Sequence, residues 1–267
     1  MVNQQEGLAR VALVTGGSSG VGAAVARRLA AQGTSVLVNF SRDAGLARQV
    51  VDQCEALGAQ AMAVKGDVAQ DQDCVALVEA ALARWGRLDA LVNCAGTTQF
   101  VPMPQLDGVQ AQDFQRIYGV NAIGPFQMAR AAARHMPAGS AVVNVSSVAG
   151  QIGSGSSFPY VMSKAALNIL TVGLARVLAP RIRVNAVLPG LIEGRWMRDG
   201  LGDDMYERVK AQYSAASALG RVSEPDHIAS AVCWLLEPDC LVTGQQIVVD
   251  AGFVLGKLPS AAGPTRE

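Results

Sequence analysis

Seven short runs of Val, Leu, Ile and Ala recur along the chain, and longer segments with helical spacing separate them. Such runs are apolar on both faces rather than alternating, which is typical of parallel strands that helices cover on both sides. The pattern therefore predicts an α/β fold with a doubly wound parallel sheet of the Rossmann type. The predicted strands span residues 11–15, 35–40, 60–64, 88–93, 141–145, 182–187 and 246–249.

Length and composition indicate one domain. The chain has 267 residues, and 50% of them are hydrophobic, which is enough for one substantial core. No internal repeat is visible, so we expect residues 1–267 to form a single domain. The segment from about 256 to 267 contains Gly, Pro, Ser and Ala without periodicity and is predicted to be a mobile tail.

The charge balance and the cysteine pattern restrict the class of partner. Lys plus Arg and Asp plus Glu both number 22, so the zero net charge offers no attraction for nucleic acid or an anionic membrane. We therefore expect a small-molecule partner. The five cysteines are scattered and form no CxxC pair, which predicts neither disulfides nor a metal site. The polar N-terminus lacks a span-length apolar segment, so a soluble cytoplasmic protein is expected.

A glycine-rich loop follows the first predicted strand and opens a predicted helix at 23–31. Its glycines allow a tight turn and a close backbone approach, and the helix N-terminus behind it favours an anion. Strand, loop and helix stand in the order that a nucleotide-binding loop requires. The candidate pyrophosphate-binding residues are Gly16, Ser18, Ser19, Gly20, Val21 and Gly22.

The same loop also matches the GxSxG pattern of serine hydrolases, with Ser18 as the nucleophile. That interpretation requires strands and an oxyanion loop upstream, but only 15 residues precede Gly16. It also requires a histidine, and neither His135 nor His227 lies at a predicted strand end. The hydrolase is therefore a remote alternative.

A second motif combines Tyr160, Lys164 and Ser147. Tyr160 and Lys164 are four residues apart on a predicted helix and so share one face, while Ser147 closes the strand at 141–145. A free tyrosine has a pKa of about 10, so its phenolate costs about 4 kcal/mol at neutral pH, and a nearby ammonium lowers that cost. Taken alone, the pair could equally be solvated, because any helix carries such a pair by chance.

With these motifs in this order, the chain resembles the compact single-domain branch of the short-chain dehydrogenase/reductase family. The resemblance runs from about residue 9 to residue 253. It implies a dinucleotide-binding oxidoreductase that transfers a hydride between a nicotinamide and a carbonyl or secondary alcohol. The matching motifs are TGxxxGxG at 15–22, Asp67-Val68, Asn93 to Gly96, Asn121, Asn144 to Ser147, Tyr160 with Lys164, Pro189-Gly190 and Val249 to Gly252.

The resemblance implies a role for each catalytic candidate. Tyr160 would be the general acid in reduction or the base in oxidation, and Ser147 would hydrogen-bond the substrate oxygen. Lys164 would lower the pKa of Tyr160 and bind the nicotinamide ribose, as Tyr160 itself would. Asn121 would hold a water that links Lys164 to solvent. An asparagine that only kinks its helix is an alternative that can hold at the same time.

The resemblance also implies contacts for the rest of the cofactor. Asp67 and Val68 would flank the adenine, and the segment with Asn93, Ala95 and Gly96 would support the cofactor from the fourth strand. The nicotinamide carboxamide would contact Pro189, Gly190 and Ile192.

Two residues depart from the family pattern. Cys94 stands where Asn is frequent and is expected to be a small buried residue with no neighbour that lowers its pKa, and Gly194 replaces a frequent Thr.

The residues at the end of the second strand favour NADP(H) as the cofactor. NAD(H) stays open as the alternative. An acid there normally binds the ribose 2′-hydroxyl of NAD, whereas an Arg accommodates the 2′-phosphate of NADP. Phe40 stands in place of the acid, and Ser41 and Arg42 follow it as candidate phosphate donors. Against this assignment, Asp43 is close, and Ser19 replaces an arginine that many NADP-dependent members carry.

The segment at about 191–220 corresponds to the family's variable substrate loop. Its aromatic and Met residues would form an apolar lid, although such residues at helical spacing are more often packing. Residues 98–100 and 151–154 would complete the substrate site. A 3-oxoacyl thioester, a small cyclic or aromatic ketone and a sugar all stay open as substrates. The candidate lid residues are Trp196, Met197, Met205, Tyr206 and Tyr213.

The predicted helix at 160–178 is apolar on nearly all sides. A helix of this kind must be covered both by its own sheet and by another surface, which predicts a homo-oligomer, in this family a tetramer. A nucleotide-sensing protein without catalysis is the alternative to an enzyme. Degraded catalytic residues would favour the sensor, but Ser147, Tyr160, Lys164 and Asn121 are all present.

Overall fold

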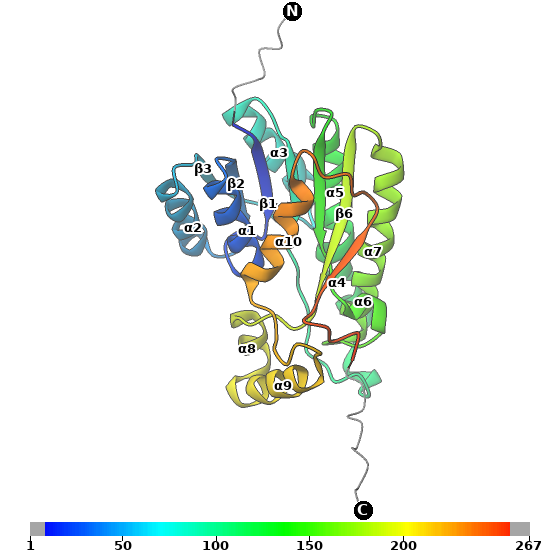
Figure 1. Ribbon diagram of the computed structural model, residues 1–267. Helices are drawn as coiled ribbons and strands as arrows, with labels where there is room; N and C mark the ends of the chain where they lie inside the picture. The colour runs from blue at the N-terminus through cyan, green and yellow to red at the C-terminus, as the bar shows by residue number, and fades with distance from the viewer. Residues whose placement is uncertain (1–8, 257–267) are drawn as a thin grey trace, which may run out of the picture.

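A seven-stranded parallel sheet with the order β3-β2-β1-β4-β5-β6-β7 forms the centre of the computed structural model, which describes residues 9–256 (Figure 1). The predicted doubly wound α/β fold is confirmed. Of the predicted tail, all but Gly256 lies outside the described residues. The strands are β1 (Val11–Thr15), β2 (Ser35–Phe40), β3 (Ala61–Lys65), β4 (Ala90–Asn93), β5 (Ser140–Val145), β6 (Ile182–Pro189) and β7 (Gln246–Val249).

Strands β3 and β5 differ from the predicted bounds by a single residue, and β4 and β6 differ by two residues at one end. Strand β4 begins at Ala90 instead of residue 88 because the buried carboxylate of Asp89 accepts the backbone N–H of Val11 at 2.8 Å and pairs with Arg87. Strand β6 continues to Pro189, whose carbonyl accepts the N–H of Val148 at 3.0 Å. The strand thereby delivers its last residue to the edge where β5 also ends.

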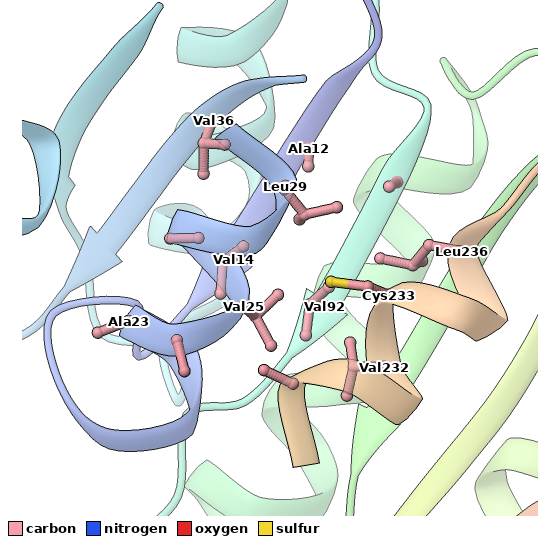
Figure 2. Close-up of a cluster of buried hydrophobic side chains, with 14 of the residues drawn as sticks. Ala12, Val14, Ala23, Val25, Leu29, Val36, Val92, Val232, Cys233 and Leu236 are labelled. Atoms are coloured by element: carbon pink, nitrogen blue, oxygen red, sulfur yellow. The ribbon is translucent and has the colours of Figure 1, made fainter. Parts of the chain in front are cut away.

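Alternate residues of each central strand pack on opposite faces of the sheet. Ala12 and Val14 face one apolar cluster, and Val11 and Leu13 face the other. The first cluster is covered by α1 (Gly20–Ala31), α2 (Ala44–Ala56) and α10 (Pro225–Leu236) (Figure 2). The second is covered by α3 (Asp71–Trp85), α5 (Gly124–Ala133) and α7 (Phe158–Leu178). This burial on both sides explains why the strands are apolar throughout.

Shorter helices and turns lie around the ends of the strands. A 3-10 turn (Leu106–Gly108) and α4 (Ala111–Tyr118) precede a π-helical turn (Gly119–Ile123) that leads directly into α5. The short α6 (Ala149–Ile152) follows β5. Helices α8 (Arg195–Leu201) and α9 (Asp203–Ala216) extend beyond the sheet, at the bottom of Figure 1.

Helix α9 is anchored to the segment that follows β7. The Tyr213 ring stacks on Phe253 with 3.7 Å between ring centroids and 12° between planes. Next to it, the N–H of Leu219 donates to the carbonyl of Ala251 at 3.0 Å. The far end of the 191–220 segment is therefore tied to the body of the protein.

Helix α7 is the one helix among the described residues that is long and apolar enough to cross a membrane. One side of it packs against the sheet through Leu174 and Ala175, and the core helix of a globular protein meets the same criterion. Its other side carries exposed apolar residues, including Met162, Ile169 and Val177.

Candidate active site

The candidate residues gather at the carboxyl edge of the sheet, around the junction between β1 and β4. These two strands are neighbours, and the chain leaves them toward opposite edges of the sheet. Ligands of doubly wound proteins bind outside the carboxyl ends of the strands at such a point.

The glycine loop after β1 packs too tightly for side chains at two positions. A Cβ at Gly16 would lie 2.8 Å from the Cα of Ala95, and a Cβ at Gly22 would lie 2.3 Å from the carbonyl oxygen of Gly16. Gly16 also has a positive φ of 60°. These glycines therefore let the loop pack closely on itself and on the segment after β4. At Gly20, where α1 begins, a Cβ would meet nothing within 4 Å, so this position is open to a phosphate.

Helix α1 begins at Gly20, three residues before the predicted start at 23. Ser19 is the N-cap residue, but its side chain makes no capping hydrogen bond. The N-terminus therefore keeps unpaired N–H groups that can bind an anion. Ser18 and Val21 are half-buried beside it, and Ser19 and Gly20 are exposed.

Asn39 is a supporting residue that the sequence analysis missed. Its Oδ1 accepts the N–H of Gly16 at 3.2 Å, and its Nδ2 donates to the carbonyl of Gly66 at 3.0 Å. It thus links the glycine loop to the end of β3. The available signal was a polar residue inside the otherwise apolar run of β2.

Thr15 is a second missed residue, at the end of β1. Its hydroxyl accepts the N–H groups of Cys94 at 3.0 Å and Ala95 at 3.1 Å. Asn93 points inward from β4, where its amide donates to the Oδ1 of Asn144 at 2.9 Å. Asn93 therefore holds strand ends together, and Ala95 and Gly96 lie nearer the loop.

Arg42, in the segment after β2, is an exposed cation. Ser41 and Arg42 are exposed, while the carboxylate of Asp43 accepts the N–H of Leu46 at 2.9 Å and so caps α2. After β3, Asp67 is exposed and accepts the N–H of Ala69. The side chain of Val68 is instead buried, and a Cβ at Gly124 would lie 2.9 Å from its Cγ2.

Tyr160 and Ser147 meet where α7 passes the end of β5. Burial raises the pKa of Tyr160 to about 12, and a hydrogen bond with the Ser147 hydroxyl opposes the rise. The Ser147 hydroxyl also accepts the N–H of Ala149 at 3.1 Å. The neighbouring hydroxyl of Ser146 instead donates to the carbonyl of Lys164 at 3.2 Å and points away from Tyr160.

Lys164 is almost fully buried, with 5% of its surface exposed. Its Nζ donates to the carbonyl of Val145 at 2.9 Å and lies 5.7 Å from the centroid of the Tyr160 ring. Burial lowers the pKa of Lys164 to about 8. The pKa of Tyr160 is raised overall, because desolvation of the phenol outweighs the opposing contribution of the Ser147 hydroxyl. A lowering contribution of Lys164 to this pKa stays a prediction.

Asn121 lies fully buried in the π-helical turn. Its Nδ2 donates to the carbonyl of Thr97 at 2.9 Å and to the Ser163 hydroxyl at 3.0 Å, and its Oδ1 accepts the N–H of Thr97. The Ser163 hydroxyl donates in turn to the carbonyl of Tyr160 at 2.7 Å. The side chain of Asn121 therefore links the segment after β4 to the first turns of α7.

The residues after β6 approach the same edge. A Cβ at Gly190 would lie 2.7 Å from the Tyr213 hydroxyl, so this glycine allows α9 to approach Pro189 and Gly190 closely. Ile192 is half-buried and forms an isolated bridge with Ser223. Gly194 has a φ of 152° at the N-cap of α8.

Cys94 is half-buried at this edge, and burial raises its pKa to about 11. The expectation that no neighbour lowers this pKa is wrong, since the Lys164 charge and a backbone hydrogen bond with Gly22 do so, but burial dominates. Cys94 is thus a neutral thiol at physiological pH.

The remaining cationic and acidic side chains supply neither a hydrolase triad nor a metal centre. The ring nitrogens of His227 contact Arg221 and the N–H of Glu224, and His135 is exposed. Within residues 9–256, no group of three or more His, Cys, Asp or Glu is arranged to hold a metal ion.

Comparison with known proteins gives relatives over almost the whole chain. The family model for enoyl-(acyl carrier protein) reductase matches residues 16–254. The ketoacyl reductase 2 named for the granaticin polyketide synthase of Streptomyces violaceoruber is 39% identical over 246 residues, which cover 91% of this chain and 96% of the relative. The 3-oxoacyl-(acyl-carrier-protein) reductase FabG of Staphylococcus aureus is 33% identical, with coverage of 93% and 99%.

Solved structures share the fold. A short-chain dehydrogenase/reductase from Burkholderia xenovorans is 39% identical and superposes with a TM-score of 0.85, covering 93% of this chain and 99% of that one. A short-chain dehydrogenase from Burkholderia cenocepacia in complex with NADP is 32% identical, with a TM-score of 0.84 and coverage of 92% and 98%. A blue fluorescent protein from a metagenomic library in complex with NADPH is 34% identical, with the same TM-score and coverage.

The buried Lys164 makes stability depend on pH. Its pKa falls from 10.5 to about 8 on folding, so the unfolded chain binds more protons between these values and wild-type stability rises with pH there. Lys164→Met is expected to raise the free energy of unfolding at pH 7 by on the order of 3 kcal/mol, since it removes a buried charge. Urea unfolding at several pH values measures the gain, which should shrink toward pH 10.5.

Lys65→Met is the matched control, because Lys65 is exposed at the end of β3. It should change stability little at any pH. A stability gain for Lys164→Met that does not vary with pH would contradict the explanation.

Proposed function

Since the chain belongs to the short-chain dehydrogenase/reductase family, we propose that it transfers a hydride between NADP(H) and the carbonyl carbon of a small-molecule ketone or its secondary alcohol. The observation that carries this proposal is the position of Tyr160, Ser147 and Lys164 at the carboxyl edge of the sheet, where the buried ammonium of Lys164 lies 5.7 Å from the centroid of the Tyr160 ring. These groups can supply a proton and stabilise a developing negative charge at the same oxygen.

The glycine loop and the start of α1 would hold the pyrophosphate, because the Ser19 side chain does not cap the helix and its first N–H groups are left for an anion. Asp67 and the backbone at Val68 would flank the adenine. Lys164 and Tyr160 would bind the nicotinamide ribose, and the carboxamide would lie against residues 189–192. Asn93 acts by supporting Ala95 and Gly96 from within the sheet.

NADP(H) is favoured over NAD(H) by the charges after β2. Arg42 and Ser41 are exposed and can donate to a 2′-phosphate, whereas the Asp43 carboxylate is engaged as the cap of α2. Two solved relatives hold NADPH or NADP. When bound, the cofactor supplies the hydride for reduction or accepts it in oxidation.

The raised pKa of Tyr160 suits a general acid. Since this pKa is about 12, the phenol stays protonated at neutral pH and can donate its proton to the substrate oxygen. Ser147 donates a second hydrogen bond to the same oxygen as negative charge grows on it. Lys164 stabilises the phenolate left behind, and a water at Asn121 would return the proton from solvent. The reverse path oxidises a secondary alcohol.

The substrate is proposed to be a 3-oxoacyl compound or a small ketone. The curated relatives named ketoacyl reductase and 3-oxoacyl reductase support this class. The segment at 191–220 is proposed as the substrate loop of the single domain, because α8 and α9 extend beyond the carboxyl edge of the sheet.

A non-catalytic nucleotide sensor on the same fold is the alternative. It would bind NADPH without consuming it in the presence of ketones. The complete set of Ser147, Tyr160, Lys164 and Asn121 at one edge favours the enzyme, since a sensor has no need of a proton donor there.

Tyr160→Phe tests the proton-transfer role. The variant keeps the ring but lacks the acidic hydroxyl, so ketone reduction should fall at least about 100-fold while NADPH binding remains. Absorbance at the NADPH band follows turnover, and NADPH fluorescence follows binding. Substantial residual turnover would reject Tyr160 as the acid.

Arg42→Ala tests the choice of cofactor. Loss of the guanidinium should weaken NADPH by about tenfold and leave NADH nearly unchanged, because only NADPH carries the 2′-phosphate. Binding is measured by fluorescence titration. Arg48→Ala on the exposed side of α2 is the matched control and should affect neither cofactor. An equal loss for both cofactors with Arg42→Ala would exclude the assignment.

The exposed apolar side of α7 supports a homo-oligomer, proposed to be a tetramer. A soluble, cytoplasmic location is proposed from the relatives such as FabG. Ile169 on this side is 70% exposed and Val177 is 74% exposed, which is costly in a monomer. Light scattering at micromolar concentration should therefore give a multiple of the 27.7 kDa chain mass. A monomeric mass would count against the oligomer.

A further inference from the structure

Two aromatic side chains lie beside the catalytic tyrosine. The Trp196 ring centroid is 6.1 Å from that of Tyr160, with 50° between the planes, and 6.3 Å from that of Phe100, with 59° between the planes. We call Phe100 and Trp196 the aromatic wall. Tilted rings at these separations have the favourable geometry of aromatic pairs.

Phe100 of the aromatic wall is held in place by its surroundings. The segment around Phe100 is fixed by the N–H of Val101, which donates to the carbonyl of Ser156 at 2.8 Å. On the other side, Gly200 of α8 has no side chain, and a Cβ there would lie 2.0 Å from the Phe100 ring. The ring of Phe100 therefore rests directly on the backbone of the helix that carries Trp196.

Trp196 is only partly buried by its neighbours. It is 49% exposed, whereas Tyr206 in the neighbouring α9 is only 2% exposed and lies in the interior. Part of the indole beside Tyr160 is therefore accessible to a ligand.

We propose that the aromatic wall binds the substrate and that this substrate is a ketone whose carbonyl carbon carries an aromatic ring. This inference rests on the proposed function and narrows its substrate class. The ring of the ketone packs against Trp196 and Phe100, which places its carbonyl oxygen toward Tyr160 and Ser147. Hydride addition to the carbonyl carbon and proton transfer from Tyr160 to the oxygen give the aryl secondary alcohol.

The test compares acetophenone with cyclohexyl methyl ketone, which have the same carbon skeleton and differ in aromaticity. We expect wild type to have the higher kcat/KM for acetophenone with NADPH. Trp196→Leu should lower the ratio of the two kcat/KM values by about two- to tenfold, the size of one aromatic contact. Trp196→Leu removes the same contact area for both ketones. The change in the ratio of the two kcat/KM values therefore measures the aromatic contribution.

Trp234→Leu is the matched control. Trp234 is also 49% exposed but lies on α10, which covers the sheet and carries none of the site residues. This variant should leave the ratio unchanged. An unchanged ratio in Trp196→Leu, or a wild type that prefers cyclohexyl methyl ketone, would overturn the proposal.

Binding is measured separately from turnover by tryptophan fluorescence with NADP⁺, which cannot reduce the ketone. Acetophenone should quench wild type and Trp234→Leu saturably, and the saturable quench should be lost in Trp196→Leu. A quench that persists in Trp196→Leu would overturn the aromatic wall as the binding surface.

A small 3-oxoacyl thioester, the N-acetylcysteamine ester of 3-oxobutanoate, distinguishes failure of the inference from failure of the proposed function. Suppose that wild type reduces this thioester far better than acetophenone and that Trp196→Leu does not change the ratio of the two ketone kcat/KM values. The proposed function then stands and the inference is overturned. Wild type that consumes NADPH with none of the three compounds defeats the proposed function. In that case, loss of the acetophenone quench in Trp196→Leu still supports the aromatic wall, and its persistence rejects it.

Discussion

Burial of the parallel sheet on both faces governs where chemistry can occur in this protein. Since α1, α2 and α10 cover one face and α3, α5 and α7 cover the other, polar groups on the faces would be buried without water. Polar side chains that a ligand can reach must therefore stand at the ends of the strands. The parallel direction brings the carboxyl ends of β1, β4, β5 and β6 to one edge, so the loops after them share a site.

The polar residues just inside that edge make the arrangement rigid. Asn93, Asn144 and Thr171 form a buried hydrogen-bonded series between β4, β5 and α7. Asn121 and Ser163 connect the next loop to the first turns of the same helix. Buried polar networks of this kind are stable only when the members find partners, so they fix the relative positions of the elements that they join. The same edge also contains the buried ammonium of Lys164, whose desolvation destabilises the fold at neutral pH.

Much of the fold and of the site could be predicted from local sequence. Apolar runs gave the bounds of β1, β2 and β7, and the spacing of Tyr160 and Lys164 placed both on α7. Effects that depend on contacts between distant segments could not be predicted. The start of β4 depends on Asp89 binding the first N–H of β1, and the raised pKa of Tyr160 depends on how much protein surrounds the phenol. Asn39 was missed because its partners, Gly16 and Gly66, are neighbours only after folding.

The reaction class depends on local sequence motifs, whereas the substrate class depends on contacts between distant segments. The reaction class is therefore easier to predict from the sequence. The proposed proton donor Tyr160, its neighbouring Lys164 and the glycine loop depend on spacings of a few residues and on the ends of strands. The aromatic wall depends on Phe100 and Gly200 meeting across the site, although they are far apart in the sequence. Spacing alone cannot separate Trp196, which stays open beside Tyr160, from Tyr206, which is buried in α9. Only the packing of α8 on the loop after β4 makes that distinction, so specificity in this fold follows from tertiary contacts that the catalytic motifs do not determine.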